Sequence, residues 1–121
     1  MLTAVPLQLD DEAFDELVDL AIARVPAELL DLVENAVLLI EDVPPADGPV
    51  LLGLYEGIPL TERDSGYSGV LPDRIYVFRK PILEICETYE DAVREVTITV
   101  AHEIAHHFGI SDDRLHELGW G

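Results

Sequence analysis

The chain is poor in cysteine, in positive charge and in long apolar runs. Its one cysteine, Cys86, cannot form an intrachain disulfide. Proteins of the reducing cytoplasm usually lack disulfides as well. Only seven residues are Lys or Arg against 25 Asp or Glu, and the resulting net charge of −18 repels phosphate backbones and anionic lipids. No stretch reaches the ~18 uncharged apolar residues of a membrane span. We therefore expect no nucleic-acid partner and no membrane partner.

The first residues also lack the features of a targeting segment. Residues 1–11 contain neither a basic start nor a long apolar run, so we expect no signal peptide and a cytoplasmic protein. Most acidic residues fall on the expected outer faces of helices, where they form a solubilising shell. The mean hydropathy of +0.20 still leaves apolar surface to cover, which makes a homodimer a candidate assembly.

Apolar residues recur at helical spacing in some segments and form short runs in others, a pattern typical of an α+β fold. With 121 residues, 49% of them apolar, we expect one domain over residues 1–121 with a single core. Helices are expected over residues 11–25, 26–35, 81–86, 88–109 and 111–118, and strands over residues 36–42, 50–55 and 74–79. The polar stretch at residues 60–72, which includes Tyr67, is expected to be a surface loop of functional length.

The run from His102 to Asp112 is the most informative part of the chain, because it reads H-E-x-x-H-x-x-G-x-x-D. Side chains four apart project from the same face of a helix, so His102 and His106 can present two ring nitrogens to one ion. Glu103 lies about 100° round the helix, which suits contact with a water on that ion better than a ligand role. Gly109 can adopt the left-handed backbone that ends a helix, and the reversal would return Asp112 as a third ligand. The fourth position would be open to water.

The third ligand is the least determined part of this site. The offset of Asp112 after Gly109 suits a chain reversal, but Asp112 could instead cap the last helix, with Asp113 competing for either role. His116 and Glu117 are alternatives from that helix. His107 points about 100° away from His106, so we expect it to support the site or the core rather than bind the ion.

These residue types point to hydrolysis assisted by a metal. A zinc ion with three protein ligands and an open position polarises a carbonyl and lowers the pKa of water toward 7. Zinc is the expected cofactor, since imidazole and carboxylate ligands suit this borderline ion. Glu103 would accept the proton of the attacking water and deliver it to the leaving amine, as general base and then acid. The expected substrate is a peptide or protein.

The motif resembles the Asp-zincin variant of the zincin metallopeptidases, in which aspartate replaces a third histidine ligand. Together with the runs 52–57 and 116–119, the chain resembles the "minimal zincin" family of small bacterial metallopeptidase-like proteins. The resemblance implies a zincin-like fold, with a small mixed β-sheet packed on helices and an HExxH active-site helix. It also implies metal ligands at His102, His106 and Asp112 and a general base at Glu103.

Related metzincins place a methionine beneath the metal, whereas the only methionine here is Met1, so Leu118 or Trp120 would form that floor.

Peptidases of this type usually pair an extended substrate with a sheet edge, and Ile75–Phe78 is the candidate edge strand, with an ordinary core strand as the alternative. Tyr55 and Tyr76 are candidate donors to an oxyanion. The competing hypothesis is a zincin-like module without turnover that serves protein interaction or dimerisation. A third hypothesis is a metal hydrolase that acts on a substrate other than peptides, for example RNA; the net charge of −18 disfavours RNA, and Glu103 suits amide hydrolysis.

Overall fold

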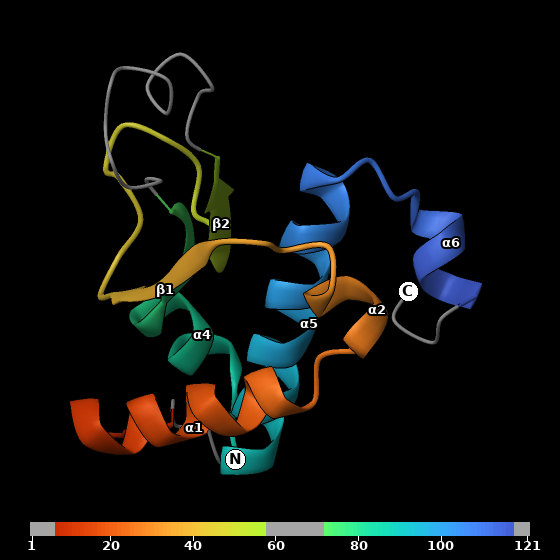
Figure 1. Ribbon diagram of the computed structural model, residues 1–121. Coiled ribbons are helices and arrows are strands. Elements are labelled where there is room, and N and C mark those ends of the chain that lie inside the picture. Colours follow the sequence, from red (N-terminus) through yellow and green to blue (C-terminus); the bar gives the residue numbers. More distant parts are fainter. Residues whose placement is uncertain (1–6, 58–71, 118–121) are drawn as a thin grey trace.

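The structure, a computed structural model, describes residues 7–57 and 72–117. Its elements follow one another as α1 (Asp11–Ala23), α2 (Ala27–Leu30), β1 (Ala36–Glu41), β2 (Gly53–Glu56), β3 (Asp73–Phe78), α4 (Arg79–Ile85), α5 (Tyr89–His107) and α6 (Asp112–Glu117) (Figure 1). Within these ranges, no helix is long and apolar enough to span a membrane. The expected loop up to residue 71, with Tyr67, and the expected floor residues Leu118 and Trp120 lie outside the described residues.

The three strands form a mixed sheet in the order β1-β3-β2, with β1 parallel and β2 antiparallel to β3. The expected α+β class with a small mixed sheet is confirmed. Because β3 is the central strand, the candidate edge role of Ile75–Phe78 is wrong and the alternative of a core strand is the one observed. The alternating pattern of that segment marks a strand but carries no information about which strands lie beside it. Both β2 and β3 contact α5, and β2 is the outer strand of the two.

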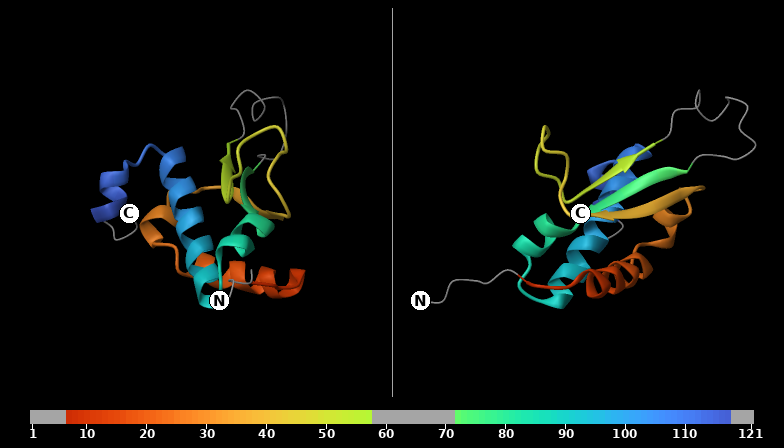
Figure 2. Two further views of the ribbon diagram at one scale, coloured as in Figure 1. Left: turned by 180° about the vertical axis from the view of Figure 1, so that it is seen from behind. Right: turned by 90° about the vertical axis from the view of Figure 1, so that its left-hand side faces the viewer.

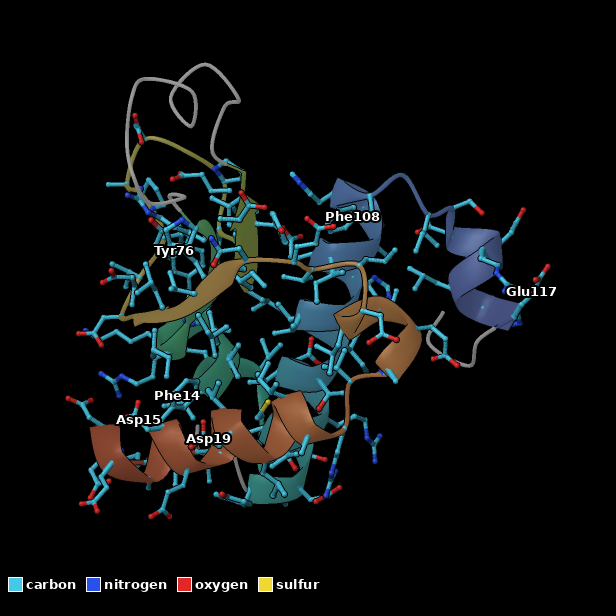
Figure 3. The ribbon with its side chains drawn as sticks, viewed as in Figure 1. Phe14, Asp15, Asp19, Tyr76, Phe108 and Glu117 are labelled. Atoms are coloured by element: carbon cyan, nitrogen blue, oxygen red, sulfur yellow. The ribbon has the colours of Figure 1, made fainter. Side chains whose placement is uncertain are left out.

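Alternate residues of β3 separate the two faces of the sheet. Ile75 and Val77 are buried and belong to the core beneath α1 and α5, whereas Arg74 is exposed on the opposite face. Figure 2 (right) looks toward the face of the sheet that α5 leaves open. Tyr76 lies on this side, and Phe14 of α1 extends into the core (Figure 3).

Helix α5 forms although its centre, Val96-Thr-Ile-Thr-Val100, has weak intrinsic helix propensity. Val96, Thr97 and Val100 are all buried, so packing against α1 and the sheet offsets the propensity cost. The buried hydroxyl of Thr97 lies within hydrogen-bond distance of two carbonyls, Val93 O at 2.7 Å and Ala21 O at 3.2 Å. Burial therefore keeps the helix continuous through a five-residue centre whose own propensity favours a strand.

Local signals fix both ends of α5. The Thr88 hydroxyl accepts a hydrogen bond from the Asp91 N–H at 3.0 Å, which confirms the expected start. At the other end Gly109 has a φ of +76°, and its N–H donates to His106 O. The Ile110 N–H donates to Ala105 O at 2.8 Å, which completes a Schellman motif. The expected left-handed glycine is confirmed, and the chain turns back toward α5.

Helix α2 is shorter than expected, since it ends at Leu30 rather than near Asn35. Leu32 and Val33 donate to carbonyls three residues back, a tighter geometry that closes a helix. Only Leu29 of α2 is buried, so no continuous apolar stripe extends it.

Candidate metal centre

The last turns of α5 carry the three motif residues predicted to act together. His102 and Glu103 are half-buried and His106 is exposed, at the end of the helix that borders β2. The rings of His102 and His106 have centroids 5.8 Å apart and planes at 65°. Helical spacing thus places both imidazoles on one side of α5, as the sequence predicts.

The Schellman turn brings Asp112 back to this helix end. Asp112 Oδ1 lies 3.1 Å from His106 Nε2. Two ligand atoms bound at roughly 2.0–2.1 Å to one tetrahedral zinc ion lie about 3.3 Å apart, so this pair fits two corners of such a site. Within the described ranges, however, no set of three His, Cys, Asp or Glu side chains is close enough to hold an ion. The structure brings together two of the three predicted ligands and places His102 one helical turn away.

Ser111, rather than Asp112, caps helix α6. The Ser111 hydroxyl accepts the Arg114 N–H at 3.1 Å, which is the capping bond of α6. Among the alternative ligands, Glu117 pairs with Arg114 at 2.9 Å. The Asp112 carboxylate therefore does not cap α6 and instead contacts the His106 ring.

Glu103 makes a contact that the sequence did not reveal. Its Oε1 accepts a hydrogen bond from the backbone N–H of Tyr55 at 2.8 Å. In an antiparallel pair only alternate N–H groups of the outer strand bond the neighbouring strand, and the Tyr55 N–H bonds Glu103 of α5 instead. The predicted base is thus held by the sheet as well as by its own helix.

One stripe of α5 runs along β2 with matched spacing. Thr99, Glu103 and His107 are four residues apart, and they meet positions 53, 55 and 57 of the strand segment, which are two apart. Four helical residues rise about 6.0 Å and two strand residues about 6.7 Å, so three successive contacts can form without loss of register.

Two glycines permit this close approach. A Cβ on Gly53 would lie 2.6 Å from Thr99 Cγ2, and one on Gly57 would lie 2.8 Å from His107 Cε1. Two glycines four residues apart, which an extended chain places on the same face, are the sequence signal that could have indicated a helix lying against this segment.

The Tyr55 side chain extends this contact. Its hydroxyl donates to Asp73 Oδ2 at 2.7 Å, and its ring stacks on His107 with centroids 3.9 Å apart and planes at 19°. His107 therefore packs rather than approaching Asp112, in line with the sequence prediction. Phe108 lies against both rings at the end of α5 (Figure 3).

Tyr76, the other candidate oxyanion donor, lies on the opposite face of the sheet. There it stacks with Phe78 at 6.0 Å and lines a pocket of about 300 Å³ with Leu54 and Glu56. Because Tyr55 and Leu54 are adjacent in β2, their side chains point to opposite faces. Tyr76 is thus separated from Glu103 by the sheet, and the expectation for it is not supported.

The α+β fold and the helix carrying the motif define a small protein of zincin-like architecture. The chain belongs to the family of zincin-like metallopeptidases, whose model matches residues 33–120. It is also similar to a solved conserved hypothetical protein from Thermus thermophilus, with 28% identity and a TM-score of 0.54 over 83% of this chain and 94% of that one. No curated protein matches the chain.

Proposed function

We propose that the protein is a zinc-dependent peptidase. The observation that carries the proposal is the approach of Asp112 Oδ1 to His106 Nε2 at 3.1 Å, beside a helix that also presents His102 and Glu103. Family membership supports the reaction class. We assign His102, His106 and Asp112 as the groups that would hold the ion. A bound zinc would supply Lewis acidity and lower the pKa of water.

The chain's own contribution to the reaction centres on Glu103. Its Oε1 is held by the Tyr55 N–H, and Oε2 has no hydrogen-bond donor among the described residues. A carboxylate fixed at one oxygen and open at the other is suited to accept a proton from the attacking water and pass it to the leaving amine. The peptide would lie along β2, since this strand is the sheet edge beside α5.

Elemental analysis of the native protein tests the metal assignment. We expect about one zinc per chain in the wild type and almost none in His102→Ala or Asp112→Ala. Asp113→Ala is the matched control, because it removes a carboxylate from the same turn of α6 and should retain the metal. Equal zinc content in the Asp112 and Asp113 variants would contradict the assignment of Asp112.

A peptidase assay then tests the role of Glu103. Glu103→Gln keeps the size of the side chain and an oxygen for the Tyr55 N–H, but removes the base. We expect kcat to fall by about 100-fold or more with the zinc content unchanged. Equal activity in the variant and the wild type would exclude Glu103 as the base.

The second candidate is a zincin-like module that acts in protein interaction or dimerisation without turnover. It is favoured by the lack of a three-ligand cluster in the part of the chain that the structure describes. A wild-type protein that takes up no zinc under the conditions above, and that sediments as a dimer, would support this candidate over the peptidase.

A further inference from the structure

The position of the Glu103 carboxylate depends on more than its helix. Helix α5 fixes the Cα and Cβ of this residue, but three side-chain torsions remain before its oxygens are placed. The Tyr55 N–H restricts these torsions by donating to Oε1 at 2.8 Å. Any group that fixes the Tyr55 backbone relative to α5 therefore also fixes the carboxylate.

Two contacts of the Tyr55 side chain, with Asp73 and with His107, bear on where its backbone lies. Its hydroxyl is bound to Asp73, which lies on β3, so this contact ties one strand to another strand. Its ring lies on the imidazole of His107, which belongs to α5. This stack is closer than the edge contact with Phe108, and it ties Tyr55 to the helix carrying Glu103. His107 lies one helical turn after Glu103, on the same stripe of α5.

We propose that His107 is a positioning residue, whose ring holds Tyr55 so that the Tyr55 N–H orients the carboxylate of Glu103. The catalytic meaning of this role rests on the proposed peptidase function, but the positioning itself does not. The geometry uses the ring of His107 as a flat surface, with planes at 19° and centroids 3.9 Å apart. Another flat ring at position 107 should therefore replace it.

The role is separate from metal binding. His107 follows His106 directly and so points about 100° away from it on the helix. It packs against Gly57 and Tyr55, whereas His106 meets Asp112. Two adjacent histidines thus serve different sides of the helix end.

The first test uses the metal-free ¹⁵N-labelled protein and follows the Tyr55 amide by its chemical shift and its hydrogen exchange. His107→Ala should accelerate exchange of this amide by about tenfold or more, the scale expected when a hydrogen bond to a charged group is weakened. His107→Phe should keep exchange within about twofold of the wild type. Tyr89→Ala, which removes an exposed aromatic ring from the first turn of the same helix, is the control and should leave it unchanged.

Gly57→Ala provides an independent variant, in case His107→Ala does not fold. Its new methyl group would lie 2.8 Å from His107 Cε1 and would push the ring from its place without removing it. We expect the Tyr55 amide to shift and to exchange faster, as in His107→Ala. If the Tyr55 amide of a folded His107→Ala or Gly57→Ala protein had the chemical shift and the exchange rate of the wild type, the proposal would be overturned.

Kinetics provide the second readout. If the wild type cleaves peptides, His107→Ala should lower kcat by about tenfold with KM changed less than twofold, and His107→Phe should restore kcat. A His107→Phe protein with a restored Tyr55 amide but no restored kcat would also overturn the proposal, because the imidazole itself would then be required. If the wild type cleaves no peptide, the peptidase function fails while the amide measurements still decide whether His107 positions Glu103.

Discussion

Substituting Gly53 by alanine should destabilise the protein, although the same change in an ordinary strand would help. A strand glycine replaced by alanine without steric conflict gains about 0.4–1 kcal/mol, because the unfolded chain loses freedom. Here the new Cβ would lie 2.6 Å from Thr99 Cγ2 and 2.8 Å from the Tyr76 carbonyl oxygen, against ordinary contacts of 3.4–4 Å. The Tyr76 oxygen is backbone of the central strand and cannot turn aside. The steric conflict therefore decides the sign.

Forced packing of this kind costs about 1–3 kcal/mol. For a chain of 121 residues, that corresponds to a fall in Tm of about 4–12 °C. Adding Thr99→Ser, which removes the offending methyl, should recover part of the loss and leave the part due to Tyr76 O. Thermal unfolding followed by circular dichroism measures each effect.

Gly48→Ala is the matched control for this substitution. The Cβ on Gly48 would come no closer than 4.0 Å to Pro45 O, so it should be neutral or stabilising. A Gly53→Ala protein as stable as Gly48→Ala would show that β2 does not lie flush against α5, and the placement of Glu103 by Tyr55 would fall with it.

Three further outcomes follow from other parts of the structure. Thr97→Val should cost about 1 kcal/mol in urea unfolding, because it removes a buried hydroxyl bonded to the helix backbone; a gain in stability would refute this. Hydrogen bonding to Arg24 lowers the pKa of Glu90 from its usual 4.5, so this pair should stabilise the protein at pH 7 and cease to do so as the pH falls through that lowered value. The Tm difference between wild type and Glu90→Gln should accordingly shrink as the buffer is acidified below pH 4.5, and an undiminished difference would count against the pair. Burial raises the pKa of Cys86, so its thiol should react with an aromatic disulfide reagent at pH 8 at least about tenfold more slowly in the folded than in the urea-unfolded protein.

Much of α5 could be predicted from the sequence because its signals are local. Thr88 caps its own helix three residues on, and Gly109 supplies the backbone conformation that ends it. Gly109 and Asp112 are close in the sequence, so the approach of Asp112 to His106 also follows from nearby residues. These inferences need no knowledge of the rest of the fold.

The sheet order could not be predicted in the same way. The segment Asp73–Phe78 begins with two charged residues and continues with four apolar or aromatic ones, a composition that is compatible with a central or an edge strand. Its place between β1 and β2 depends on partners that are distant in the sequence, as in the pairs Ala36–Asp73 and Gly53–Val77. The contact between Tyr55 and Glu103 is also of this kind, since 48 residues separate them.

The spacing shared by β2 and α5 limits how the length of this chain can change. An extra residue within Gly53–Gly57 would turn the following side chains to the other face of the sheet, and one within Thr99–His107 would rotate the rest of the helix by about 100°. Either change would detach the helix from the strand. Insertions and deletions among homologous proteins should consequently fall elsewhere, for instance in residues 43–52 between β1 and β2, and an alignment with frequent gaps inside either segment would contradict the shared register.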